Sequence, residues 1–290
     1  MKQLIALTLA LLLLAGCAAA YDGPTESAWV LMEMRTTHYN TLTGETQTML
    51  WTHSYDSFGN RVRTNFYSDG ELTDEYKRTY DERGNCIREV TRNHFWFFSC
   101  PVSRTGHTYD EQDQLLTTTY RNGLGIKTGG DAYTYDDEAN TVTWEGTYDT
   151  QTKYLNENGD PIRTVTYSRP AGMEIESLRE YDARGLNTRT TEYLDGVLSS
   201  TAEMRYDDQG RILENTWYDA DGALLRRITW LYEEHTVTTW DKEGNKSVQT
   251  LRPDGQVETQ EDYDPDGNLL ARSEYIYTEI QIPAERRDAP

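Results

Sequence analysis

The sequence is short of histidine, cysteine and positive charge, and these shortages count against several functions. Its 5 histidines are scattered without the HExxH spacing of a zinc site, and GxSxG, a P-loop and GxGxxG after a strand do not occur. With 49 Asp and Glu, some carboxylates are expected to lie close together by chance, so proximity alone does not indicate an acid–base pair. We therefore expect no enzyme activity and no cofactor. The alternative is catalysis by a carboxylate pair, which needs a cleft that gathers both groups.

Positive charge is outweighed throughout the chain. Lys and Arg number 28, and the formal net charge is −21. Such a surface repels phosphate backbones, and no basic stripe is evident along the sequence. We expect no nucleic-acid partner and attribute the acidity first to solubility.

Helical patterning is missing beyond the N-terminus. No later stretch repeats apolar residues at i, i+3, i+4 and i+7, so no long helix is predicted. Phe is rare at 5, whereas Tyr (21), Trp (7) and Thr are frequent, and these last three favour strands. Glycine is plentiful beside Asp or Asn, which is turn chemistry.

The first apolar stretch predicts an export signal. Lys2 precedes an apolar run that ends at Leu14, too short to span a membrane. The following Ala-Gly-Cys17 resembles a bacterial lipobox, which implies that the Cys17 thiol receives a diacylglycerol and becomes the N-terminus. The alternative is a plain secretory signal with an incidental cysteine. Ala18 after Cys17 would, by the same resemblance, allow outer-membrane sorting; the cell membrane stays equally open.

The full chain is therefore expected to divide into four segments. Residues 1–16 are the lipoprotein signal peptide, 17–27 the lipidated cysteine and tether, 28–280 one β domain, and 281–290 a C-terminal tail. We expect an extracytoplasmic protein held on the membrane through its lipid anchor, because several acyl chains anchor stably.

One short turn recurs along the β domain. A Gly follows an aromatic residue by four positions after Tyr55, Tyr80, Tyr181, Tyr206, Tyr218, Trp240 and Tyr263, with degenerate copies after Tyr109, Tyr135, Leu155 and Leu251. Turns recur every 10–14 residues or so, which fits one strand and one turn. The pattern predicts an all-β fold, a single antiparallel meander of about twenty short strands. Open sheets of that width curl or close, so we expect it strongly curved or rolled, with its Leu, Ile, Val and Tyr face packed inward.

Alternate turns of such a zigzag fall on the same edge. One edge is expected to carry Tyr55, Tyr80, Tyr109, Tyr135, Tyr181 and Tyr206, and the other Tyr67, Tyr120, Tyr148, Tyr193, Tyr218, Trp240 and Tyr263.

The segments YDDQGRILENTWYDADG (206–222) and YDERGN (80–85) resemble the YD-repeat, or RHS-repeat, family. The resemblance covers roughly Tyr55 to Leu270. It implies antiparallel meanders, which in long members form hollow shells that enclose toxins or decorate cell surfaces, sometimes with carbohydrate-binding roles. This chain is too short to enclose a cargo domain. We therefore expect it to share the fold of the family but not the toxin-enclosing role.

Two cysteines could form a disulfide. Cys86 and Cys100 flank a turn centred near Asn93, where they would lie opposite each other on a hairpin. Export permits the bond. Two free thiols are the alternative.

One copy of the repeat can be interpreted either as a calcium-binding loop or as a turn. Asp262, Asp264 and Asp266 precede Gly267 at calcium-loop spacing. The twelfth position of the loop is Ser273 rather than Glu, and no flanking helix is predicted. The repeat already accounts for these residues as a turn.

Aromatic residues offer contact surfaces. Phe95, Trp96, Phe97 and Phe98 interrupt the repeat and form the densest apolar cluster, which is either a plug in the core or a contact patch for a sugar or protein. Sugar-stacking faces could also come from Trp51, Trp144, Trp217 and Trp230, although aromatics within strands more often serve packing.

These observations favour a lipid-anchored, extracytoplasmic repeat protein with a non-catalytic binding or structural role at the cell envelope. The alternative is a carbohydrate-binding surface lipoprotein. An envelope protein or a glycan is the expected partner.

Overall fold

The computed structural model describes residues 25–95 and 98–283, which form twenty β-strands and, within those ranges, no helix. The strands are β1 Thr25–Tyr39, β2 Thr46–Tyr55, β3 Arg61–Ser68, β4 Glu71–Tyr80, β5 Cys86–Phe95, β6 Phe98–Tyr109, β7 Leu115–Asn122, β8 Lys127–Asp136, β9 Thr141–Glu145, β10 Asp149–Leu155, β11 Pro161–Ser168, β12 Met173–Tyr181, β13 Asn187–Leu194, β14 Val197–Tyr206, β15 Ile212–Asp219, β16 Leu224–Tyr232, β17 Thr236–Asp241, β18 Lys246–Leu251, β19 Val257–Tyr263 and β20 Leu269–Pro283.

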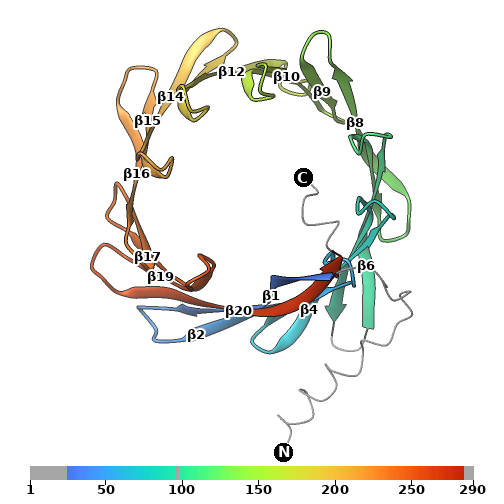
Figure 1. The fold of residues 1–290 in the computed structure, drawn as a ribbon, viewed down its shortest axis with the longest axis vertical. Helices are drawn as coiled ribbons and strands as arrows, with labels where there is room; N and C mark the ends of the chain where they lie inside the picture. Colours follow the sequence, from blue (N-terminus) through green and yellow to red (C-terminus); the bar gives the residue numbers. More distant parts are fainter. Residues whose placement is uncertain (1–24, 96–97, 284–290) are drawn as a thin grey trace, which may run out of the picture.

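The strands form one closed antiparallel sheet. Each strand pairs with the next, and β20 returns to pair with β1, so the wall runs once around (Figure 1). Twenty strands at about 4.8 Å each give a wall roughly 96 Å round. The predicted all-β meander of about twenty strands is confirmed, and closure leaves neither β1 nor β20 as an open edge.

The closing seam is long. It runs in register from Thr25 opposite Pro283 to His38 opposite Ala271, with one bulge near Leu31. The hydroxyl groups of Thr36 and Ser273 lie 2.8 Å apart within it, and both residues are buried. The β strands extend slightly beyond the predicted 28–280 domain at both ends.

The turns occupy two edges, as the zigzag predicts. The first edge holds the turns at 56–60, 81–85, 110–114, 137–140, 156–160, 182–186, 207–211, 233–235 and 252–256. The second edge holds the turns that alternate with these. The first strand residue, Thr25, and the last, Pro283, also lie at the first edge because β1 runs from it.

The two faces of the wall differ in chemistry. Alternation and register place Trp51, His53 and Tyr206 on one face, here called the tyrosine face. The opposite face, here called the charged face, carries rows of Arg and Glu such as Arg163 opposite Leu178 and Arg227 opposite Thr216.

The expected apolar packing of one face is wrong. Within 25–94 and 99–283, the buried apolar side chains are Ala271 and, at the end of β20, Pro283, while Leu224, Leu231 and Ile276 are each about half exposed. A single-layered wall has no second layer to cover either face. Its stability therefore depends on the backbone ladders and on side-chain rows between neighbouring strands.

No helix in the described ranges is both long and apolar enough to cross a membrane.

Candidate functional site

The repeated turn is built around one carboxylate. At 207–211, Asp207 Oδ1 accepts hydrogen bonds from the backbone N–H groups of Gln209 at 2.9 Å and Arg211 at 2.8 Å. Gly210 closes the turn with its N–H on the Asp207 carbonyl at 3.1 Å, at a φ of 80° that suits glycine. The same arrangement recurs around Asp56, Asp81, Asp182, Asp219 and Asp241, so the predicted turn chemistry is confirmed.

Six repeat tyrosines at the first edge link neighbouring hairpins. Each hydroxyl donates to a backbone carbonyl 19 to 24 residues earlier, which in five of the six pairs belongs to the first residue of a strand. The pairs are Tyr55 to Leu31 (2.8 Å), Tyr80 to Arg61 (3.0 Å), Tyr109 to Cys86 (2.9 Å), Tyr135 to Leu115 (3.2 Å), Tyr181 to Pro161 (2.8 Å) and Tyr206 to Asn187 (2.8 Å). Each of these backbone carbonyls lies beyond the end of the hydrogen-bonded pairing with the next strand, and the tyrosine hydroxyl supplies its hydrogen-bond donor.

These tyrosines remain donors at neutral pH. Burial raises the pKa of all six hydroxyl groups in the ladder above the ordinary value of 10.0. Tyr120, near the second edge, differs because its hydrogen bond to Asp131 at 2.6 Å raises its pKa to about 12. The ladder is therefore structural rather than a set of proton carriers.

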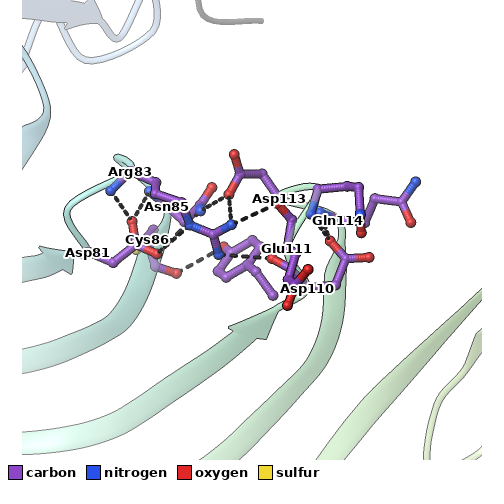
Figure 2. Close-up of polar contacts among 10 residues, drawn as sticks. Asp81, Arg83, Asn85, Cys86, Asp110, Glu111, Asp113 and Gln114 are labelled. Atoms are coloured by element: carbon purple, nitrogen blue, oxygen red, sulfur yellow. Dashed lines mark hydrogen bonds and ion pairs between the residues drawn. The ribbon is translucent and has the colours of Figure 1, made fainter.

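Two neighbouring turns of the first edge are joined by an arginine (Figure 2). Arg83 forms an ion pair with Asp113 at 2.8 Å and donates to the carbonyls of Glu111 and Asp110 at 3.2 and 2.9 Å. Asn85 donates to the same Asp113 carboxylate at 2.7 Å. Asp113 takes the glycine position of its turn at a φ of 64°, and these contacts offset the strain of that conformation.

A cavity of about 530 Å³ opens beside this junction. Its lining joins the turns at Phe58, Arg83 and Asp113 to Val30 and Ile282 of the closing strands. Asp113 is the one carboxylate among the described residues that line it, and it already bonds Arg83 and Asn85. The cavity therefore offers polar and apolar contacts to a ligand but no carboxylate pair for acid–base chemistry.

The four tryptophans considered for sugar stacking lie on the tyrosine face. Register places Trp51 opposite Phe66, Trp144 opposite Tyr133 and Gln151, Trp217 opposite Ala202, and Trp230 opposite Thr239. All four are half-buried. The rings of two are already in contact with other groups: Trp51 packs against the Phe66 ring with ring centres 4.8 Å apart, and the Arg226 guanidinium lies over Trp217 at 5.1 Å.

Cys86 and Cys100 are not brought together. Both are free thiols, and Cys86 lies opposite Tyr80 while Cys100 lies opposite Asn93. β5 continues past residue 93 to Phe95, which lies opposite Phe98 of β6, so the hairpin is not centred at 93 and the expected opposition of the two cysteines is wrong. The two cysteines therefore lie at different positions along the hairpin and in different cross-strand pairs.

The aspartates of the proposed calcium loop are held by the turn. Asp264 accepts from the Asn268 side chain at 2.8 Å and from its backbone at 2.7 Å, and that side-chain bond is the main cause that lowers the pKa of Asp264. Asp262 accepts from Gln260 at 3.1 Å. Within the described ranges, no three His, Cys, Asp or Glu side chains are grouped to hold a metal ion.

Several predicted sites lie outside the described residues. Cys17 and the signal segment precede residue 25, and Trp96 and Phe97 fall in the gap. The backbones of Phe95 and Phe98 pair across the hairpin at its tip on the second edge.

A basic cluster on the charged face was missed from the sequence. Register aligns Arg63, Lys77, Val90, Arg104 and Arg121 across five neighbouring strands, with Arg88 and Arg92 beside Val90. No basic stripe is evident along the sequence, but strand register brings basic residues together across the sheet. Strand alternation in 61–121 could have revealed it, had the register been known.

Comparisons with known proteins give weak similarities. No protein family matches the chain. No curated protein matches it either.

Solved structures include several with partial likeness. A porin-like protein from Bacteroides uniformis ATCC 8492 is 12% identical at a TM-score of 0.42, over 88% of this chain and 99% of that one. TcdB2-TccC3 without its hypervariable C-terminal region is 12% identical at 0.34, over 80% of this chain and 16% of that one. TcdB2-TccC3-Cdc42 is 13% identical at 0.35, over 86% and 17%. At these TM-scores and identities the likeness carries no argument about function.

Proposed function

We propose that the chain is a lipid-anchored, extracytoplasmic repeat protein with a non-catalytic binding or structural role at the cell envelope. The observation that carries the proposal is the exposure of both faces of a closed wall, in which Ala271 and Pro283 are the buried apolar side chains of 25–94 and 99–283. A single-layered wall has no packed core, and nearly all of its side chains are available for contact with a partner. The resemblance of its turns to YD repeats agrees with a surface role.

The position of the anchor sets the orientation in this proposal. Residues 17–24 reach at most about 28 Å when extended, and they lead to Thr25 at the first edge. The first edge, with its aspartate turns, would then stand near the membrane. The second edge, including the hairpin tip at Phe95 and Phe98, would point away from it.

Charge on both faces supports a wall that lies in water. The charged face carries Arg163 with Glu176, and the tyrosine face carries Arg78 with Glu89, both at 2.5 Å. Ion pairs on both sides keep favourable hydration when each side meets water.

The anchor is tested by replacing its cysteine. Cys17→Ala should move the protein from the membrane fraction to the soluble extracytoplasmic fraction and abolish incorporation of labelled palmitate. The matched control is Cys86→Ala, which removes a thiol from β5 and should leave both readouts unchanged. Membrane retention and labelling of the Cys17→Ala protein at the level of the unaltered chain would refute lipid anchoring.

The binding role is tested in the intact envelope. Cross-linking in cells should give defined adducts with envelope components for the anchored chain, and these should weaken when Cys17→Ala releases it. Identical background adducts for both forms would count against a role that depends on display at the membrane.

A carbohydrate-binding role is the second candidate, and the gathering of four tryptophans on one face favours it. Sugar rings stack on such faces, and Trp144 and Trp230 have no ring partner among the described residues. Titration with a broad set of glycans should shift tryptophan fluorescence, and Trp144→Phe and Trp230→Phe should reduce the shift. A flat response across the whole set would dismiss this candidate.

A further inference from the structure

The charged face contains a hollow lined mainly by cations. Its volume is about 250 Å³, and Lys77, Arg88, Arg92 and Arg104 line it together with Thr79, Val90 and Pro101. The hollow lies on β4, β5 and β6, where register sets Val90 between Lys77 and Arg104. Its size is below that of typical sites for drug-sized ligands and suits a small group.

Charge around the hollow is unbalanced. Arg63 and Arg121 extend the row on either side, and the carboxylate that meets these cations is Glu75. Its oxygens lie 3.3 Å from Arg63 Nε, 3.2 Å from Lys77 Nζ and 4.0 Å from Arg92 Nε. One buried carboxylate thus faces several cations in a chain whose net charge is −21.

The rest of this face is built differently. There, the arginines form close ion pairs: Arg205 and Arg227 share Glu214 at 3.1 and 3.0 Å, and Arg272 meets Glu261 at 3.2 Å. What is local to β3 to β7 is that Glu75 meets three cations, Arg63, Lys77 and Arg92, and that Arg88 has no ion pair within the described ranges.

Two buried donors beside the hollow lack a hydrogen-bond acceptor. The Nε atoms of Arg92 and Arg104 are buried and have no hydrogen-bond partner among the described residues. Arg104 uses Nη2 on the Gly123 carbonyl at 3.3 Å, which leaves its Nε–H without an acceptor. Arg88 has neither an ion pair nor a side-chain hydrogen bond within the described ranges. Buried donors without partners cost free energy that an incoming acceptor recovers.

We propose that this hollow binds a tetrahedral oxyanion group, phosphate or sulfate, carried by a small ligand. Guanidinium groups present planar pairs of N–H donors that match such oxygens, and hydrogen bonds between charged partners are strong. The bound group neutralises the surplus cations and accepts from the guanidinium N–H groups that face the hollow, first of all those of the exposed Arg88. The acidic remainder of the chain disfavours a long polyanion and leaves a small ligand as the occupant. This site is independent of the lipid anchor.

The test is a titration of the full chain, purified in detergent, with sodium phosphate and sodium sulfate at ionic strength matched by sodium chloride. Calorimetry should show one saturable site for at least one anion, and the thermal midpoint should rise with that anion. Comparing the two anions identifies the group, and a sugar 6-sulfate against its unsulfated sugar shows whether a glycan carries it.

Variants locate the site. Arg88→Gln removes a cation that holds no fold contact and should weaken anion affinity roughly tenfold or more. Arg104→Gln should do the same, and it serves as a second, independent variant. The matched control is Arg189→Gln, which lies on the charged face at β13 outside the hollow and should leave affinity unchanged. Equal affinity in Arg88→Gln, Arg104→Gln and the unaltered chain, or a thermal rise that chloride reproduces, would overturn the proposal.

Discussion

The tyrosine hydroxyl is the residue-scale contact that ties one repeat to the next. Tyr206 donates to the Asn187 carbonyl at 2.8 Å. Tyr206→Phe keeps the ring and removes the donor, so we expect a loss of about 1 kcal/mol in the free energy of unfolding. Urea unfolding followed by circular dichroism measures it.

A matched tyrosine provides the control for that measurement. Tyr193 lies in β13 on the charged face, and its hydroxyl has no hydrogen bond within the described ranges. Tyr193→Phe should change stability by no more than a few tenths of a kcal/mol. If both variants lose the same amount, the ladder hydrogen bond contributes nothing of its own.

Separation along the chain decides which of these contacts the sequence predicts. Asp207 and Gly210 act within a five-residue turn, so their roles follow from local backbone chemistry. The partner of Tyr206 lies 19 residues earlier, and it depends on register across a whole hairpin. The edge on which each tyrosine sits could be predicted, but the carbonyl that it binds could not.

At the scale of the element, each hairpin depends on a left-handed residue. Gly222 has a φ of 81°, and a Cβ there would meet no atom within 4 Å, so Gly222→Ala isolates backbone strain. We expect it to destabilise the chain by about 1 kcal/mol. Thermal unfolding of the purified protein measures the change.

Gly106 in β6 supplies the opposite case. Its φ lies outside the left-handed region, and an added Cβ would be 4.0 Å from the nearest atom, the Ile87 carbonyl oxygen. Gly106→Ala should therefore be neutral or stabilising by about 0.4–1 kcal/mol, since alanine restricts the unfolded chain. Equal losses at Gly106 and Gly222 would mean that the turn conformation is not what glycine provides.

The hairpin of β5 and β6 shows how an element escapes prediction. The positions of the two cysteines suggested a turn centred near Asn93, whereas Phe95 pairs with Phe98 and a bulge follows Thr91. An insertion without Gly, Asp or Asn at its centre gives no turn signal, and a shift of a few residues separates Cys86 from Cys100.

Acid should weaken the turns together. The side-chain hydrogen bond from Asn245 lowers the pKa of Asp241, and Asn268 does the same for Asp264, from the ordinary value of 3.8. A folded pKa below the unfolded one gives stability that is complete above about pH 5 and is lost as pH falls through 3.8 and below. Urea midpoints measured at pH 7, 5 and 3 should stay level between the first two and drop at the third.

One substitution checks the origin of that acid effect. Asp241→Asn keeps an acceptor oxygen and removes the charge, so stability at pH 7 should fall and the drop between pH 5 and pH 3 should shrink. An unchanged drop would assign the acid sensitivity to other carboxylates.

For the whole molecule, closure was the least predictable feature. The sequence predicted a sheet too wide to stay flat, which follows from strand count and spacing. It could not indicate that Thr36 meets Ser273, because that contact joins residues 237 positions apart and no local signal marks either strand as a seam. The absence of a packed core follows from closure, since each strand then has two neighbours and the wall needs no second layer to finish its ladders.

A circular permutant tests whether the ring has a preferred start. Thr25 lies opposite Pro283 in the seam, so an Asn-Gly turn can join them as in any two-residue hairpin. New termini can open between Asp195 and Gly196, in the turn between β13 and β14. Every strand keeps both neighbours, and we expect the same circular dichroism spectrum, the same elution volume and a thermal midpoint within a few degrees.

Deleting β20 provides the contrast, because it leaves β1 and β19 without a shared partner. The exposed ladders should then drive self-association, seen as early elution and light scattering. The permutant changes two connections, one joined and one opened, but it has no open edge. A monomeric deletion variant beside an aggregating permutant would show that connectivity, and not the continuous ladder around the wall, holds the molecule closed.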